Sequence, residues 1–245
     1  MFILFMMLFL SVNSQKRISA DKRSESQMII LNYSLQMPLS ELSTIFGYNS
    51  SLGIAYLNNK NSFLYGVDAN FMFGNKIKND SLLDMISTQD GYLINASGEL
   101  DQVLLFERGF NTHLLFGKAF MPKENDKTGI YCYLGVGYLQ HKIRIESDRT
   151  NLPQINSEYI KGYDNFTSGI SSKICLDYMY FDKKTLLEFY VGFEFINALT
   201  KNRRAYSFGE MIYNDRDINI DQLLGARIGV IIPINRNNEG DFHYR

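Results

Sequence analysis

The sequence lacks several features that mark common classes of protein. It contains no tryptophan and only two cysteines, and its formal net charge is −1 over 245 residues. A charge so close to zero argues against a nucleic-acid-binding protein, because such proteins usually carry a concentrated basic field that offsets the phosphates. Beyond residue 12 no apolar stretch approaches the roughly 20 residues that a membrane-spanning helix needs. A membrane protein with this sequence must therefore be a closed barrel of strands, since lipid offers no water to unpaired backbone groups.

Aromatic residues, by contrast, are abundant. The chain holds 18 phenylalanines and 16 tyrosines. Soluble domains seldom contain so many, whereas membrane barrels place aromatic rings on their outer walls and in girdles at the two lipid interfaces. The composition therefore favours a membrane β-barrel, and the length suits a single domain.

The N-terminus resembles an export signal. Residues 1–12 form an almost continuous apolar run that is too short to span a bilayer, and the small residues Val12 and Ser14 suit cleavage after Ser14. We favour a signal peptide over a buried N-terminal helix, although no lysine or arginine precedes the run. The predicted organisation is a signal peptide over 1–14, a polar periplasmic tail over 15–27, a barrel over 28–234 and a C-terminal tail over 235–245.

An alternation of apolar and polar residues begins at Met28 and predicts antiparallel strands. The segments that show it are 28–37, 51–58, 62–74, 103–121, 129–145, 169–181, 185–199 and 222–233. Short connections (59–61, 122–128 and 182–184) alternate strictly with long ones (38–50, 75–102, 146–168 and 200–221). Outer-membrane barrels have this pattern, with short periplasmic turns and long extracellular loops. We therefore predict an all-β fold, a closed eight-stranded antiparallel up-and-down transmembrane β-barrel with both ends of the sheet on the periplasmic side.

Each predicted strand has one apolar and one polar face. In the seventh strand, for example, Phe189, Val191 and Phe193 lie on one face, and Gly192 and Glu194 lie on the other. Alternation alone would also suit a soluble lipocalin-type barrel, whose apolar wall surrounds a ligand. The apolar face here is too large and too aromatic for the interior of so small a barrel, and the polar face is rich in glycine, asparagine and isolated charges. We therefore predict that the apolar face contacts lipid.

The polar face then forms the interior of the barrel. Its predicted network consists of Asp68, Glu107, Asn111, His113, Lys173, Asp177, Glu188, Glu194 and Arg227. Buried charges persist only when they are paired and hydrogen-bonded, so we expect Arg227 to pair with Glu188 or Glu194, and Lys173 with Asp177. We favour a network that simply fills the barrel over a conducting pore, because open aqueous channels belong to wider barrels.

Reactive side chains show no catalytic or metal-binding pattern. His113, His141 and His243 lie far apart, and no serine is spaced to suggest a nucleophile beside them. Neither paired histidines nor a cluster of cysteine and histidine occurs at ligand spacing. Cys132 and Cys175 fall on opposite faces of neighbouring strands, where a disulfide would distort the sheet, so we expect free thiols. We predict no catalytic residue, no metal site, no cofactor and no enzymatic activity.

The long loops mix aromatic rings with charge. The candidate interface residues are Tyr163, Asp164, Arg203, Arg204, Tyr206 and Phe208. Aromatic residues and arginine are enriched at protein interfaces, and lipopolysaccharide phosphates would also attract the cations. A third interpretation is that the loops pack on one another as a cap. Residues 38–47 could add one or two helical turns, with Leu39, Leu42 and Phe46 on a face that packs over the barrel rim.

Several short motifs carry a resemblance to a known family. They are RGF at 108–110, FGK at 116–118, QHKIRI at 140–145, KGYD at 161–164 and the paired Arg203 and Arg204. In these motifs, and over most of its mature length, the chain resembles small eight-stranded outer-membrane β-barrel proteins of Bacteroidota. The resemblance implies the barrel fold but no established activity. The chain departs from the common pattern at 235–245, which continue past the last strand, so that Phe242 and Tyr244 are the candidates for a terminal insertion signal.

Two functional hypotheses from different classes remain. The first is a non-enzymatic structural or scaffolding barrel that docks with other outer-membrane proteins, such as an accessory subunit of a barrel-assembly or secretion machine. The second is a surface ligand-binding barrel or small channel. We favour the first, because the interior looks filled and the loops resemble an interface. The expected surroundings are outer-membrane lipids, lipopolysaccharide and other outer-membrane proteins, with no nucleic acid.

Overall fold

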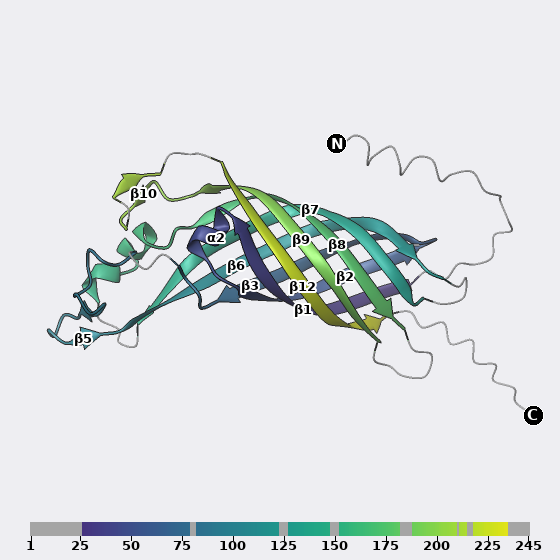
Figure 1. The fold of residues 1–245 in the computed structure, drawn as a ribbon, viewed down its shortest axis with the longest axis horizontal. Helices are drawn as coiled ribbons and strands as arrows, with labels where there is room; N and C mark the ends of the chain where they lie inside the picture. The colour runs from purple at the N-terminus through teal and green to yellow at the C-terminus, as the bar shows by residue number, and fades with distance from the viewer. Residues whose placement is uncertain are drawn as a thin grey trace, which may run out of the picture.

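A closed barrel of eight antiparallel strands forms the body of the protein. The computed structural model describes residues 26–78, 82–122, 127–147, 152–181, 188–209, 211–214 and 218–234. The strands are β1 (Ser26–Ser40), β2 (Asn49–Lys60), β3 (Phe63–Gly74), β6 (Val103–Phe120), β7 (Gly129–Ser147), β8 (Thr167–Tyr180), β9 (Glu188–Asn202) and β12 (Asn219–Pro233). Each pairs with its neighbours along the chain, and β1 closes the barrel against β12 (Figure 1). The predicted fold class is confirmed.

Several strands extend beyond their predicted ends on the loop side. β1 continues to Ser40, β7 to Ser147 and β9 to Asn202, while β8 begins at Thr167 and β12 at Asn219. In the added ends of β7, β8 and β9, both faces carry polar residues, such as Glu146 and Ser147, so the apolar and polar alternation stops although the hydrogen-bonded ladder continues. The predicted ends of these strands were wrong for that reason. At the opposite end, β1 begins within the segment 15–27 that was expected to be a tail.

The long connections all lie at one end of the barrel, at the left of Figure 1. They contain α2 (Leu42–Ile45), the two-residue strands β4 (Leu93–Ile94), β5 (Leu100–Asp101), β10 (Tyr206–Ser207) and β11 (Ile212–Tyr213), and the 3-10 helices η1 (Pro153–Ile155) and η2 (Tyr159–Gly162). The expected helical turn over 38–47 is present but shorter than predicted, because residues 38–40 still belong to β1. None of the helices in the described part of the chain is long and apolar enough to cross a membrane.

The short connections and both ends of the sheet lie at the other end. β1 starts and β12 stops there, and Met28 pairs with Pro233 across the closure. The expected signal peptide 1–14, most of the tail 15–27 and the C-terminal tail 235–245 with Phe242, His243 and Tyr244 lie outside the described residues. The same holds for most of the two short connections 122–128 and 182–184.

The apolar faces of the strands point outward. Phe193 is 63% exposed, Val136 62% and Ile170 71%, and comparable side chains cover every strand of the barrel. The predicted direction of the apolar wall is therefore confirmed.

The inward wall is more layered than alternation suggested. An apolar cluster fills the short-turn end and consists of Met28, Ile30, Ala55, Leu57, Leu64, Leu115, Ala119, Tyr131, Tyr133, Cys175, Met179, Tyr190 and Ile231. A second cluster fills the loop end and consists of Leu42, Phe46, Met72, Leu82, Leu139, Ile143, Ile145, Tyr163, Ile196, Ala198 and Leu223. Between the two clusters lie the buried charges of Asp68, Lys173 and Glu194. Leu42 and Phe46 of the α2 segment belong to the second cluster, so this segment packs over the barrel rim.

Candidate functional site

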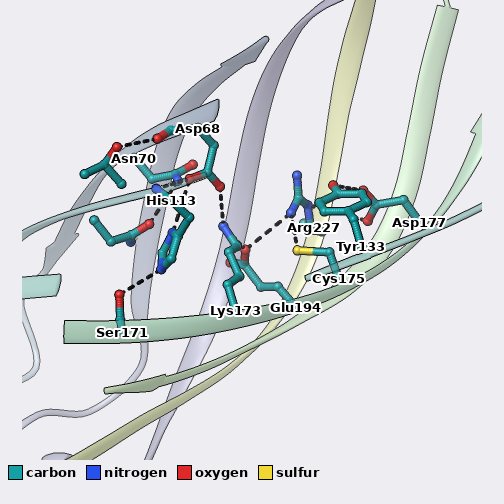
Figure 2. A network of polar contacts seen from close by, with 12 residues as sticks. Asp68, Asn70, His113, Tyr133, Ser171, Lys173, Cys175, Asp177, Glu194 and Arg227 are labelled. Carbon is teal, nitrogen blue, oxygen red and sulfur yellow. Dashed lines mark hydrogen bonds and ion pairs between the residues drawn. The ribbon is translucent and has the colours of Figure 1, made fainter. Parts of the chain in front are cut away.

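A chain of buried charges crosses the interior of the barrel. Lys173 Nζ on β8 lies 2.8 Å from Asp68 Oδ2 on β3 and 2.9 Å from Glu194 Oε2 on β9 (Figure 2). Gln36 on β1 donates its amide to Glu194 Oε1 at 2.8 Å. All four side chains are nearly inaccessible to solvent. Because a buried charge is tolerated only with partners, this chain of contacts ties four separate strands together across the interior.

Arg227 on β12 continues this network toward the short-turn end. Its guanidinium donates to the Tyr190 hydroxyl at 2.9 and 3.1 Å and to Cys175 Sγ at 2.9 Å. Asp177 and Glu194 each lie 3.6 Å from it, and Asp177 also accepts a hydrogen bond from the Tyr133 hydroxyl. The guanidinium lies over the rings of Tyr133 and Tyr190 as well. Two carboxylates and two aromatic faces therefore surround one cation, and Figure 2 shows Tyr133, Asp177 and Glu194 around it.

The predicted pairing within this network was partly wrong. Lys173 pairs with Asp68 and Glu194, not with Asp177. Lys173 and Asp177 share a face of one strand, but four residues along a strand span about 13 Å, which is too far for an ion pair. Of the two partners suggested for Arg227, Glu194 lies beside it, whereas Glu188 is buried near the short-turn end of β9.

Serine, histidine and aspartate come together in the same layer. His113 Nδ1 lies 3.2 Å from Asp68 Oδ1, and His113 Nε2 lies 2.9 Å from Ser171 Oγ (Figure 2). The expectation that no serine stands beside a histidine was wrong, because His113 and Ser171 flank Gly137 of β7 in the sheet register, which spacing in the sequence does not reveal. The order of contacts matches that of a hydrolase triad. Ser171 and His113 are each only 1% exposed, however, and Lys173 also binds Asp68, so the arrangement serves as a buried linkage within the network.

A second polar layer lies closer to the loops. Asn49 donates to Glu107 Oε1, and Asn70 donates to Asn111 Oδ1, both at 2.9 Å. Sequence reasoning missed a further linkage in this layer. Asp221 Oδ2 lies 2.8 Å from His141 Nε2 and accepts a hydrogen bond from the Thr200 hydroxyl at 2.6 Å. The sequence pattern assigns residues 200–221 to a loop, so it does not predict that the side chains of Thr200 and Asp221 face the barrel interior.

The thiols lie on opposite walls of the sheet. Cys175 is buried in the network, whereas Cys132, which pairs with Leu176 on the neighbouring strand, lies on the outer wall. This geometry agrees with the parity argument, since the two sulfur atoms point to different sides of the sheet.

The predicted loop residues bind largely to one another. Arg204 forms an ion pair with Asp164 and lies over the Phe166 ring, and the hydrogen bond from Arg204 to Asp164 raises the pKa of the guanidinium. Phe208 packs against Tyr163 at 5.4 Å between ring centroids and against Tyr206 at 5.5 Å.

A further contact joins the loops to the barrel. Arg203 donates to the Ser168 hydroxyl at 2.7 Å. Together with the Arg204 pair and the aromatic stack around Phe208, this contact makes most of the candidate interface residues part of a cap over the barrel.

Other loop side chains remain exposed. Met85 is 61% exposed, Leu100 56%, Met211 60% and Tyr213 79%. Leu100 belongs to the β4–β5 hairpin. Tyr213 belongs to the β10–β11 hairpin and packs its ring against Tyr206 of the cap at 5.0 Å between centroids, but both hairpins keep exposed apolar surface. These hairpins were not predicted, because strands of two residues are too short to show an alternating pattern.

The fold and its two walls define the class of protein. A closed barrel with a broad outward apolar band and a charged interior is an integral β-barrel of the outer-membrane type. The expected localisation as an integral outer-membrane barrel is confirmed.

Comparison with known proteins gives similarity in fold alone, to outer-membrane proteins. No protein-family model matches the chain, and neither does any curated protein. The chain is similar to Neisserial surface protein A, with 11% identity, a TM-score of 0.44 and coverage of 85% of this chain and 98% of that one. It is similar to the N-terminal β-barrel domain of Pseudomonas aeruginosa OprF, with 10% identity, a TM-score of 0.40 and coverage of 85% and 100%. For Yersinia pestis Ail in complex with the heparin analogue sucrose octasulfate, the identity is 10%, the TM-score 0.38 and the coverage 85% and 99%. The class assignment above rests on the barrel and its walls, not on these similarities.

Proposed function

We propose that the protein is a non-enzymatic structural or scaffolding barrel that docks with other outer-membrane proteins, as an accessory subunit of a barrel-assembly or secretion machine. One observation carries the proposal. The interior is filled by side chains from end to end, while the loop end presents exposed apolar residues. A barrel without a free interior acts through its surfaces.

The filled interior argues against the alternative of a small channel. Ions would have to pass two apolar clusters and a layer in which Lys173 and Arg227 are both held by carboxylates. Breaking such buried pairs is costly, because it leaves uncompensated charges in a low-dielectric interior. The network therefore favours a static support over a conduction path.

The exposed hairpins favour docking with a protein. Ile94, Leu100, Met211 and Tyr213 are each at least 47% exposed, on or directly beside the short strands of the loop end. Exposed apolar side chains gathered on protruding elements mark interaction surfaces, and aromatic residues and methionine are enriched in the cores of interfaces. Lipids and lipopolysaccharide of the outer membrane are the further proposed surroundings. The assignment to a Bacteroidota family rests on the sequence motifs alone and is part of this proposal.

A gentle detergent pull-down of the full chain tests the docking role. We expect a larger complex to co-purify with the protein, and we expect Leu100→Asp combined with Tyr213→Asp to weaken that association. Ser157→Asp, at an exposed loop position of another connection, is the matched control. If only monomer is recovered under conditions that preserve other membrane complexes, the scaffold proposal fails. Single-channel current, or stabilisation of the purified monomer by a small ligand, would favour the second hypothesis instead.

The export signal is also a proposal. Cleavage after Ser14 would leave Gln15 as the first residue of the mature protein. Sequencing of the N-terminus of protein isolated from membranes tests this, and a chain that still begins at Met1 would contradict it.

A further inference from the structure

Two cations face each other on the outer wall near the loop end. Arg108 on β6 and Lys142 on β7 are direct partners in the sheet register, and both side chains point away from the interior, since their neighbours Glu107, Gly109 and His141 are buried. Like charges placed directly opposite on one face of a sheet destabilise it. This pair therefore carries a cost that an anion bound between the two side chains would remove.

Neither cation is neutralised by an acidic residue in the described part of the chain. The Arg108 guanidinium donates to the backbone oxygen of Glu107 and lies 5.0 Å from the centroid of the Phe106 ring. Lys142 is exposed. The nearby outward cations differ in this respect, because Arg144 is paired with Glu146 at 2.6 Å and Arg204 with Asp164.

A groove on the outer wall leads to this pair. It has a volume of about 330 Å³, and its lining includes Arg108, Lys142, Gln140 and the rings of Phe71, Phe110 and Phe166. The groove thus offers cations at its polar end and aromatic surface beside them. A ligand that fits it carries negative charge on a headgroup and apolar chains that continue along the wall.

The height of the pair on the barrel agrees with a lipid headgroup. Below Arg108, the outward residues of β6 are Phe110, Thr112, Leu114 and Phe116, followed by Lys118. Arg108 and Lys118 are ten residues apart, which is about 33 Å along the strand, or about 23 Å of height at a tilt of about 45°. An apolar band of outer-membrane barrels is about 25 Å tall. The two cations of this strand therefore lie at the two lipid interfaces, with Arg108 at the loop side.

We propose that Arg108 and Lys142 form a binding site for the phosphate groups of a phosphorylated glycolipid of the outer leaflet. Charge complementarity fixes the headgroup, because two cations on adjacent strands can share one phosphate group of the sugar, and arginine binds phosphate through its planar fork of donors. The aromatic lining and the apolar wall below it receive the acyl chains. The site goes beyond the docking role and does not depend on it, since it faces lipid instead of the loop hairpins.

Native mass spectrometry of the full chain, extracted in mild detergent, tests the site. The lipids offered are bisphosphorylated lipid A, the same lipid without phosphates, and phosphatidylglycerol, with inorganic phosphate as a competitor. We expect bisphosphorylated lipid A to bind at least about tenfold more tightly than its dephosphorylated form, as charge-assisted hydrogen bonds contribute. Arg108→Gln combined with Lys142→Gln should abolish that preference, and Arg108→Lys should retain most of it.

The matched control is Lys118→Gln, which removes a cation of the same strand and wall at the opposite interface. It should leave the preference unchanged. Retention of the preference for bisphosphorylated lipid A in the double variant would overturn the proposal. Phosphatidylglycerol that binds as tightly as this lipid would also overturn it, as would displacement of the lipid by inorganic phosphate at similar concentrations. Folding of each variant is checked independently by the difference in gel mobility between unheated and heated samples. Without glycolipid, the double variant should be at least as stable as the unaltered protein, because it relieves the repulsion between the two cations.

Discussion

The ammonium group of Lys173 lies 2.8 Å from the Asp68 carboxylate, although two strands separate β3 from β8 in the sheet. The contact therefore bridges the interior of the barrel, not adjacent strands. It resists flattening of the barrel because it joins walls that share no backbone hydrogen bonds.

Replacement of this lysine should destabilise the protein strongly. Lys173→Met leaves Asp68 and Glu194 without their shared cation, and loss of one partner of a buried pair costs about 3–5 kcal/mol. Denaturant titration in lipid vesicles measures the change in the free energy of unfolding. Lys118→Met on the outer wall is the control and should change it little. A loss below about 1 kcal/mol for Lys173→Met would contradict the structural role, since it would fall in the range of exposed pairs.

Ser171 should be chemically inert despite its position beside His113. Because the side chain is buried and its surroundings are packed, a fluorophosphonate probe should not label the folded protein at this serine. Ser171→Ala should lower the free energy of unfolding by about 1 kcal/mol, as expected for one lost hydrogen bond. Labelling of the unaltered protein that disappears in Ser171→Ala would show that the triad is reactive.

An arginine on the outer wall should be costly only within the apolar band. Phe193 on β9 is 63% exposed and lies amid outward apolar residues, so Phe193→Arg should destabilise the barrel in vesicles by about 2–4 kcal/mol. Met85→Arg, at a loop position that is 61% exposed, is the control and should have an effect within about 0.5 kcal/mol. Equal effects at the two positions would mean that Phe193 does not face lipid.

The aromatic cap should open when Gly162 gains a side chain. A Cβ atom at this position would lie 1.8 Å from Cδ2 of Phe208, so Gly162→Val must displace that ring. We expect faster cleavage of the loops by chymotrypsin in reconstituted vesicles, with the barrel itself still resistant. Ser157→Val, at an exposed position of the same connection, should not change the rate. Unchanged cleavage in Gly162→Val would indicate that the Phe208 stack does not hold the cap closed.

The strands and their orientation could be predicted because the information is local. Phe193 and its neighbour Glu194 differ in polarity, and this difference can be read without knowledge of the rest of the fold. Because successive side chains of a strand point to opposite faces, the alternation assigns the two residues to opposite walls. The strict order of short and long connections then determined which end of the barrel carries the loops. Where both faces become polar, as at Thr200 and Lys201, this local signal ended before the strand did.

The contacts of the interior could not be predicted in the same way. Ser171 and His113 meet only because the register of β6, β7 and β8 and the tilt of the strands bring them to one height. Those quantities depend on the whole barrel, and no short segment encodes them. The apolar ends of the interior were missed for a related reason, since each strand adds only a few inward apolar residues, such as Met28 and Ile30 beside Asn32, or Ile143 and Ile145 beside His141.

The pairing of β1 with β12 has a consequence for how the barrel is assembled. Ile30 and Ile231 are register partners, yet nearly the whole barrel lies between them in the chain. Contacts between residues so distant in sequence require a long loop of chain to close, which costs conformational entropy. Such contacts therefore form late in folding. Until the final strand arrives, β1 presents an open edge with unpaired backbone groups, which is the kind of edge that other strands join. Completion of the barrel therefore waits for the last part of the chain to be delivered to the membrane, and up to that moment β1 must be shielded from pairing with a strand of another protein.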